Sequence, residues 1–140
     1  MNNIFIALLL LLFASFIMKG QNIRAKFFVA QTGIACKEYS GGGGCEMRYY
    51  CYLEFQKKYV NVFYRTIYRC SPKEMESTYD SSPSEIKKYM WKKEGRRISI
   101  NGFTDYDVLK IESGKLIGTK KINYQQNEII EFKEEPCQKK

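Results

Sequence analysis

The side chains best suited to binding chemistry lie together between residues 87 and 97, where cations alternate with aromatic rings. They are Tyr89, Trp91, Lys92, Lys93, Arg96 and Arg97. Aromatic faces beside cations suit sugars, lipid headgroups or stacked bases, because the ring packs on a flat surface while the cation binds an anion. The alternative is a solvated hairpin whose tryptophan belongs to the core. Both interpretations stay open on the sequence alone.

A second aromatic group lies in the segment 46–55, in a chain with 11 tyrosines. Alternation along this segment places Tyr50 and Tyr52 on the face opposite Cys51 and Leu53. The two tyrosines could line a recognition patch. The ordinary explanation is an amphipathic ring that covers part of a sheet.

The sequence offers few residues suited to catalysis, because the chain contains no histidine. Histidine is the usual general base near neutral pH, and serine and cysteine triads depend on it. An enzyme built from this sequence would have to use cysteine, lysine, tyrosine or carboxylates, with a hyper-reactive Cys51 as its sign. A closed zinc site would need four thiolates scattered over about a hundred residues. We therefore expect a non-enzymatic protein without metal or cofactor.

The five cysteines are Cys36, Cys45, Cys51, Cys70 and Cys137. In an exported chain they imply disulfides, and an odd count leaves at least one thiol unpaired. We favour Cys36–Cys45, because four glycines between them make a flexible loop, together with Cys70–Cys137. Cys51 is then free and buried, where a thiol behaves as a small hydrophobe.

The first 20 residues resemble a secretory leader, with an apolar run from Ile4 to Met18 followed by Lys19-Gly20. This run is short for a membrane span and typical of a signal peptide, although no basic residue precedes it, so an uncleaved anchor is the alternative. We expect cleavage near Gly20, export to the periplasm or beyond the cell, and a single domain over 21–140. Loss of Lys19 would lower the formal charge from +8 to +7. That charge favours anionic envelope surfaces, while export makes nucleic acid an unnatural partner.

Alternating apolar residues separated by turn signals predict an all-β fold of seven or eight strands. The segments are Ile23–Thr32, Glu46–Phe55, Tyr59–Cys70, Tyr89–Lys92, Arg97–Asn101, Tyr106–Glu112, Lys115–Asn123 and Asn127–Lys133. They would form a small antiparallel barrel or sandwich. Ser-Pro-x-Glu at Ser71–Glu74 and Ser82–Glu85 combines an N-cap serine with a first-turn proline, and predicts one or two short helical turns.

Between Tyr79 and Ile122 the order Trp91, Gly95, Ile98-x-Ile100 and Gly102, closing on Leu116-Ile117-Gly118, resembles small exported bacterial β-barrel domains of the lipocalin-like and META type. The lipocalin Gly-x-Trp signature is absent from residues 21–28. The resemblance implies a barrel or sandwich in the envelope or outside the cell.

The sequence predicts a non-enzymatic binding or interaction module. One form would hold a small apolar or amphipathic ligand in a cavity lined by residues such as Phe63, Leu109 and Ile111. The alternative is an envelope-associated or secreted interaction or inhibitor protein with a filled barrel and an exposed basic-aromatic patch. A histidine-free enzyme is the third alternative.

Overall fold

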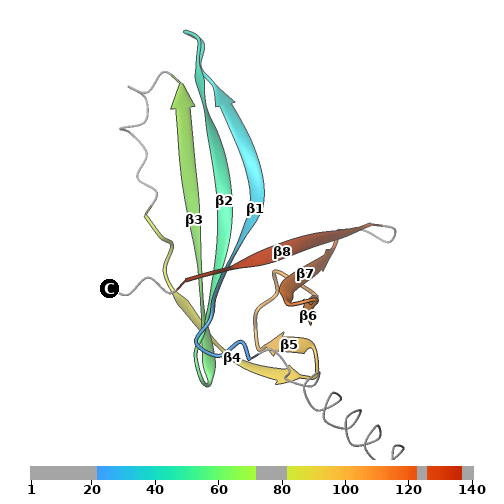
Figure 1. The fold of residues 1–140 in the computed structure, drawn as a ribbon. Coiled ribbons are helices and arrows are strands. Elements are labelled where there is room, and N and C mark those ends of the chain that lie inside the picture. The colour runs from blue at the N-terminus through green and yellow to red at the C-terminus, as the bar shows by residue number, and fades with distance from the viewer. Residues whose placement is uncertain (1–21, 72–81, 123–125, 137–140) are drawn as a thin grey trace, which may run out of the picture.

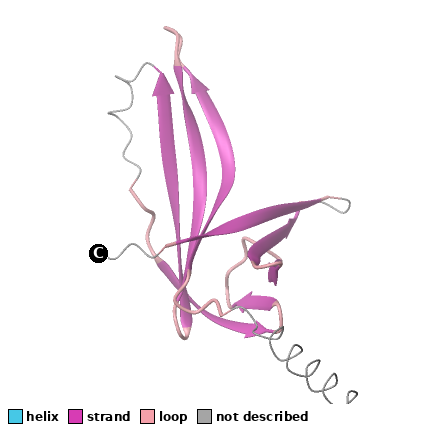
Figure 2. Ribbon diagram, in the orientation of Figure 1, coloured by secondary structure: helices cyan, strands magenta, loops and turns pink. Residues whose placement is uncertain are grey.

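The computed structural model describes residues 22–71, 82–122 and 126–136, and these ranges form eight antiparallel strands (Figures 1 and 2). The strands are β1 (Phe27–Glu38), β2 (Gly44–Phe55), β3 (Tyr59–Ser71), β4 (Lys87–Glu94), β5 (Arg97–Ile100), β6 (Val108–Glu112), β7 (Lys115–Lys121) and β8 (Asn127–Glu135). Each strand pairs with the next along the chain, and β8 returns to β1, so the sheet closes into a small barrel. The all-β prediction is confirmed, in its barrel form. No helix in these ranges is long and apolar enough to cross a membrane.

The first three strands extend well beyond their ladders with the other barrel strands. β1 pairs with β8 only over Phe27–Val29, and β3 pairs with β4 only over Tyr59–Val62, whereas the β2 ladders run to the far ends of both neighbours. Beyond the barrel, β1, β2 and β3 therefore continue as a three-stranded sheet (Figure 1). We call its residues 31–38, 44–50 and 65–71 the extension.

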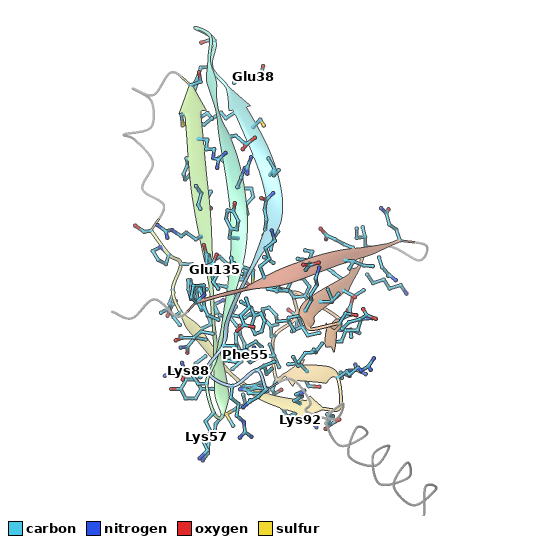
Figure 3. All side chains as sticks on the ribbon, in the orientation of Figure 1. Glu38, Phe55, Lys57, Lys88, Lys92 and Glu135 are labelled. Carbon is cyan, nitrogen blue, oxygen red and sulfur yellow. A yellow bond between two sulfur atoms is a disulfide. The ribbon has the colours of Figure 1, made fainter. Side chains whose placement is uncertain are left out.

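The barrel interior is made by the alternating apolar residues of these strands. Its fully buried side chains include Phe28, Phe55 and Phe132, and among the described residues no Asp, Glu, Lys or Arg is buried. Figure 3 shows Phe55 among the side chains that fill the barrel. A core of this kind is stabilised by roughly 25 cal/mol for each Å² of apolar surface removed from water.

A tight turn joins β6 and β7 into a hairpin. Ser113 and Gly114 have φ values of 48° and 82° and lie between the paired residues Glu112 and Lys115. Two successive positive φ values are typical of a type I′ turn, whose twist matches that of the strands it joins. A tight turn at Ser113-Gly114 therefore joins β6 to β7.

Two local predictions were wrong. Residues 82–86 contain no helical turn, because the backbone N–H of Ser84 donates to the Tyr64 carbonyl and its hydroxyl accepts from the Tyr64 N–H, both at 2.8 Å. These bonds hold the segment against β3. The first strand begins at Phe27 rather than Ile23, since Ala25 has a φ of 60°, and it runs on to Glu38. The other predicted turn, after Ser71, lies outside the described residues.

Gly118 of β7 lies where two buried rings meet. A Cβ atom at this position would lie 2.8 Å from Cδ1 of Tyr106 and 3.1 Å from Cε2 of Phe132. The two rings also pack edge to face at 5.4 Å, so neither can move away freely. We expect Gly118→Ala to lower the free energy of unfolding by about 1–3 kcal/mol in urea denaturation. Gly33→Ala is the control, because its Cβ would meet only Tyr49 at 3.4 Å. An equal loss of stability in both variants would show that crowding at Gly118 is not the cause.

Candidate functional site

The barrel interior is packed with side chains. Leu109 and Ile111 are buried in the same apolar cluster as Phe55 and Phe132. The prediction that Phe63 lines an interior cavity was wrong, because Phe63 lies on the outer face, where its ring stacks on Tyr52 at 4.8 Å. It shares that face with Tyr52 because the two residues are directly paired across β2 and β3. An interior ligand would have to displace core side chains.

Trp91 and Tyr89 belong to the barrel wall. The Trp91 ring packs edge-on against Phe55 at 5.0 Å, and its Nε1 donates to the carbonyl of Gln56 at 3.0 Å. The ring of Tyr89 packs against Phe103 at 5.8 Å. Both side chains are half-buried and touch the core cluster. Their aromatic character is therefore used largely for packing.

The cations of the same hairpin are not grouped around those rings. Arg96 and Arg97 are exposed at the β4–β5 turn, and Lys92 forms an ion pair with Glu94 at 2.7 Å. Alternation along β4 directs Lys92 away from the side of the strand that carries Trp91 and Lys93. The predicted patch is therefore divided between two faces.

One hollow nevertheless gathers part of that patch. It measures about 560 Å³ and is lined by Asn22, Ile23, Arg24, Lys57, Trp91, Lys92 and Lys93. Lys57 and Lys92 lie at the end of the barrel away from the extension (Figure 3). We call this the basic hollow. Sequence reasoning missed Arg24 and Lys57, because they come from two turns far apart in the chain and no motif links them.

Tyr50 and Tyr52 lie in a row of aromatic rings on the outer face of β1–β3. The Tyr52 ring stacks on Phe63, and its centroid lies 5.6 Å from that of Phe27. The Tyr50 ring lies 6.5 Å from the Tyr52 ring. Desolvation raises the pKa of the Tyr52 hydroxyl, with the nearby Arg65 acting in the opposite direction. All four rings stay half-exposed. The row is thus a half-exposed aromatic surface at the foot of the extension.

The cysteine pairing differs from the prediction. Cys45 and Cys70 are directly opposite each other in β2 and β3 and form the disulfide, so Cys36–Cys45 and Cys70–Cys137 were both wrong. Cys36 pairs in register with Glu46, so its side chain lies on the opposite face of the sheet from that of Cys45. Cys36 is free and exposed, Cys51 is free and buried as predicted, and Cys137 lies outside the described residues.

Cys51 lies in a small polar group at the barrel end nearest the extension. The hydroxyl of Tyr64 donates to a carboxylate oxygen of Asp105, and Tyr106 packs in the same core cluster. Burial, reinforced by the negative charge of Asp105, raises the pKa of the Cys51 thiol to about 12. Burial likewise raises the pKa of Tyr106. The thiol is therefore protonated near neutral pH and is a poor nucleophile.

We expect iodoacetamide to modify Cys36 in the native protein at pH of about 8 and to leave Cys51 unmodified until denaturant is added. The reason is that only the thiolate reacts, and burial keeps Cys51 both protonated and inaccessible. Peptide-resolved mass spectrometry separates the two cysteines from Cys137. Rapid native modification of Cys51 would contradict this and would favour a nucleophilic role.

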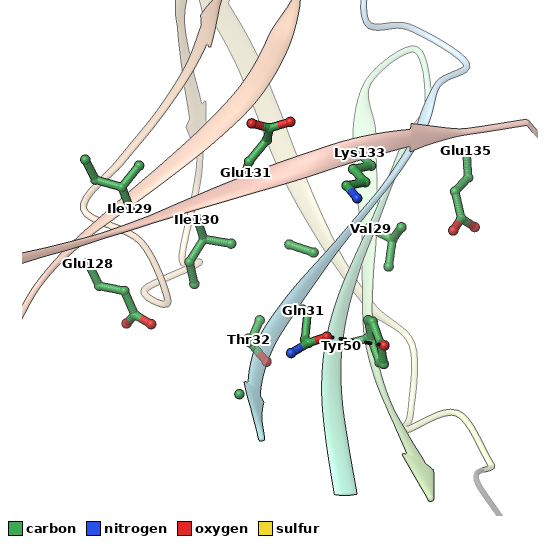
Figure 4. Close-up of a pocket in the computed structure, with 12 residues that line it drawn as sticks. Val29, Gln31, Thr32, Tyr50, Glu128, Ile129, Ile130, Glu131, Lys133 and Glu135 are labelled. Atoms are coloured by element: carbon green, nitrogen blue, oxygen red, sulfur yellow. Dashed lines mark hydrogen bonds between the residues drawn. The ribbon is translucent and has the colours of Figure 1, made fainter. Parts of the chain in front are cut away.

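A notch opens between β1 and β8, where the two strands separate beyond their short ladder. Its volume is about 550 Å³, and its lining includes Val29, Gln31, Thr32, Glu128 and Ile130 (Figure 4). Both strands present an edge to this notch. Among the described residues, no group of three or more metal-ligating side chains lies here or elsewhere.

Together these features define a small closed antiparallel β-barrel with a packed interior and a three-stranded extension. Comparison with protein-family models, curated proteins and solved structures finds no match. Function is therefore inferred from the surfaces of this chain itself.

Proposed function

We propose that this chain is an exported, non-enzymatic interaction module that binds a protein partner through the extension. The observation that carries the proposal is the open edge of β1: beyond Val29, no strand of the described residues pairs with this side of the sheet. A strand edge with free backbone donors and acceptors is a ready template for another chain. Ile34, 55% exposed on this strand, adds an apolar contact.

The packed interior supports an interaction module over a ligand carrier. In a ligand-carrying barrel Leu109 and Ile111 would line the cavity, whereas here both pack against other core residues. The absence of histidine and the inert Cys51 support a non-enzymatic role. The apolar N-terminal run and the Cys45–Cys70 disulfide support export, since disulfides persist in oxidising compartments. The resemblance to lipocalin-like and META-type domains stays a prediction.

A photo-cross-linking amino acid placed at position 34 tests the proposal. Position 86 is the matched control, because Ile86 is 58% exposed and lies outside the extension. In the producing cells we expect one protein to cross-link through position 34 and not through position 86. That protein, once purified, should bind an Ile34→Lys variant at least about tenfold more weakly than the Ile86→Lys variant. Equal cross-linking at both positions, or none, would overturn the proposal.

A second candidate function is binding to an anionic envelope surface through the basic hollow. The observation that favours it is the convergence of Arg24, Lys57 and Lys93 beside Trp91. Sedimentation with phosphatidylglycerol vesicles tests it. A Lys57→Glu variant should bind the vesicles several-fold more weakly than Lys120→Glu, which changes the charge equally at an exposed position outside the hollow. Equal binding of the two variants would exclude the hollow.

A further inference from the structure

The basic hollow opens where two neighbouring strands of the barrel stop pairing with each other. β3 starts at Tyr59, which pairs with Met90, whereas the end of β4 pairs with β5 instead. The Trp91 N–H still donates to the Lys58 carbonyl at 3.5 Å. Lys57, one position further along the same turn, lines the hollow together with Trp91. The hollow is therefore a gap in the barrel wall, and a small ligand can enter it.

Two turns place cations at this gap. Arg24 lies in the turn before β1, and its N–H donates to the side-chain oxygen of Asn22 at 3.0 Å. The Ala25 N–H bonds this turn to the carbonyl of Phe55 at 2.8 Å. Lys57 lies in the β2–β3 turn, which a backbone hydrogen bond closes at 2.8 Å. Both cations thus project from backbone that is fixed before a ligand arrives, which reduces the entropy lost on binding.

The charge of the hollow is positive and unbalanced. Arg24, Lys57 and Lys93 line it, and its lining includes no carboxylate. Arg24 and Lys57 are exposed, and neither forms an ion pair with another described residue. Lys92 differs from them, because Glu94 pairs with it at 2.7 Å. An anion in the hollow would therefore meet two cations that have no counter-charge, with Lys93 beside them.

The rest of the lining is largely apolar. It includes Trp91, which is half-buried, and Ile23, which is 1% exposed and belongs to the barrel core. A bare inorganic ion would leave this part of the wall in contact with water. An anion attached to carbon atoms would cover it and gain from the apolar surface removed from water. The lining thus favours an organic anion.

We propose that the basic hollow binds a phosphate monoester, with Arg24, Lys57 and Lys93 around the phosphate and Trp91 against the carbon atoms of the ester. Arginine binds phosphate through two parallel N–H bonds, while lysine acts as a point charge. A monoester has close to two negative charges at neutral pH, whereas a diester has a single one. Two unbalanced cations therefore match the monoester better. This inference rests on the second candidate function and names the anion, which a lipid headgroup or a free ester can supply.

Trp91 is the only tryptophan of the chain, so its fluorescence reports on the hollow directly. The full-length protein is titrated with glycerol 3-phosphate, a monoester, and with glycerophosphoglycerol, a diester. At pH of about 7.5 we expect the monoester to bind at least about threefold more tightly, because it has the larger charge.

The pH dependence of binding isolates the charge of the ligand. The chain has no histidine, the side chain that ordinarily titrates between pH 5 and 8. Lowering the pH to about 5 protonates the monoester, whose second pKa is about 6, and leaves the diester charged. Binding of glycerol 3-phosphate should weaken about threefold to tenfold, while that of glycerophosphoglycerol should stay within about twofold.

The variant Arg24→Gln/Lys57→Gln should weaken binding of glycerol 3-phosphate at least about tenfold. Its matched control is Lys120→Gln/Lys133→Gln, which removes the same charge at exposed positions outside the hollow. Equal affinity for the two esters, or an equal effect of the two double variants, would overturn the inference. If the esters bind equally while Lys57→Glu still lowers binding to phosphatidylglycerol vesicles, the monoester is excluded and the second candidate function is retained.

Vesicles separate the two sources of the ester. Phosphatidic acid presents a monoester as its headgroup, and phosphatidylglycerol presents a diester. Preferential sedimentation with phosphatidic acid vesicles, lost in Arg24→Gln/Lys57→Gln and kept in the control, would assign the monoester to a lipid. Binding of glycerol 3-phosphate without this preference would assign it to a free ester.

Discussion

Replacing Phe55 by alanine is expected to lower the free energy of unfolding by about 3–5 kcal/mol, the largest effect of any single substitution considered. The Phe55 side chain is 0% exposed at the end of β2. Its ring packs edge to face against Phe28 at 5.8 Å and against Trp91 at 5.0 Å, so truncation leaves a cavity bounded by two rings. Each of these rings would lose contacts that water cannot replace. Urea denaturation monitored by tryptophan fluorescence measures the loss and reports on Trp91 directly.

Ile86→Ala is the control for Phe55→Ala. Ile86 is 58% exposed, and its truncation should change the free energy of unfolding by less than about 0.5 kcal/mol. If Phe55→Ala lowered the free energy of unfolding by less than about 1 kcal/mol, the ring would contribute little to packing at this end of the barrel. Trp91 would then be available for binding rather than committed to packing.

The strands could be predicted from the sequence because their signal is local. Alternation places Leu109 and Ile111 on one face of β6, and Ser113-Gly114 supplies the turn to β7, so neither inference needs knowledge of the rest of the chain. The start of β1 could not be found this way. Ile23 is apolar and fully buried, yet it precedes the strand, because Ala25 turns the chain.

The disulfide pairing could have been predicted from the sequence, but only by following the register of paired strands. The predicted strands Glu46–Phe55 and Tyr59–Cys70 pair as a hairpin that contains the pair Phe55 and Val60, and continuing that register to the far end sets Cys45 opposite Cys70. Proximity in sequence favoured Cys36 instead, and it misled because neighbouring strands can present nearby residues on opposite faces. Register, rather than loop length, decides which cysteines meet.

The candidate sites were less predictable, since they depend on which strand ends come together. The basic hollow combines Lys93 with Arg24 and Lys57, and the notch combines Thr32 with Glu128. Nothing in the local pattern around Thr32 or Glu128 indicates that β1 and β8 close the barrel. Barrel closure is a property of the whole sheet, so sites at its seam are invisible to motifs.

Removing the disulfide with Cys45→Ser/Cys70→Ser is expected to lower the free energy of unfolding by about 2–4 kcal/mol if the chain unfolds as one unit. The bond joins residues separated by 25 positions, and the strand register places it near the tip of the extension, at the opposite end of the β2–β3 ladder from Phe55. Its loss should therefore free the extension first. Hydrogen exchange should show faster exchange over residues 44–50 and 65–71, while the β6–β7 hairpin keeps its protection.

Cys36→Ser provides the control, because Cys36 is free and exposed in the same extension. It should leave both the free energy of unfolding and the exchange pattern unchanged within about 0.5 kcal/mol. If the double variant loses protection equally in the barrel, the extension and barrel are one cooperative unit and local opening is excluded. If only the extension opens, reduction of a single bond would remove the ordered β1 edge while the barrel stays folded. Binding through the extension would then require the intact disulfide, and therefore an oxidising compartment. The expected export of the chain would in that case be a condition of its proposed function.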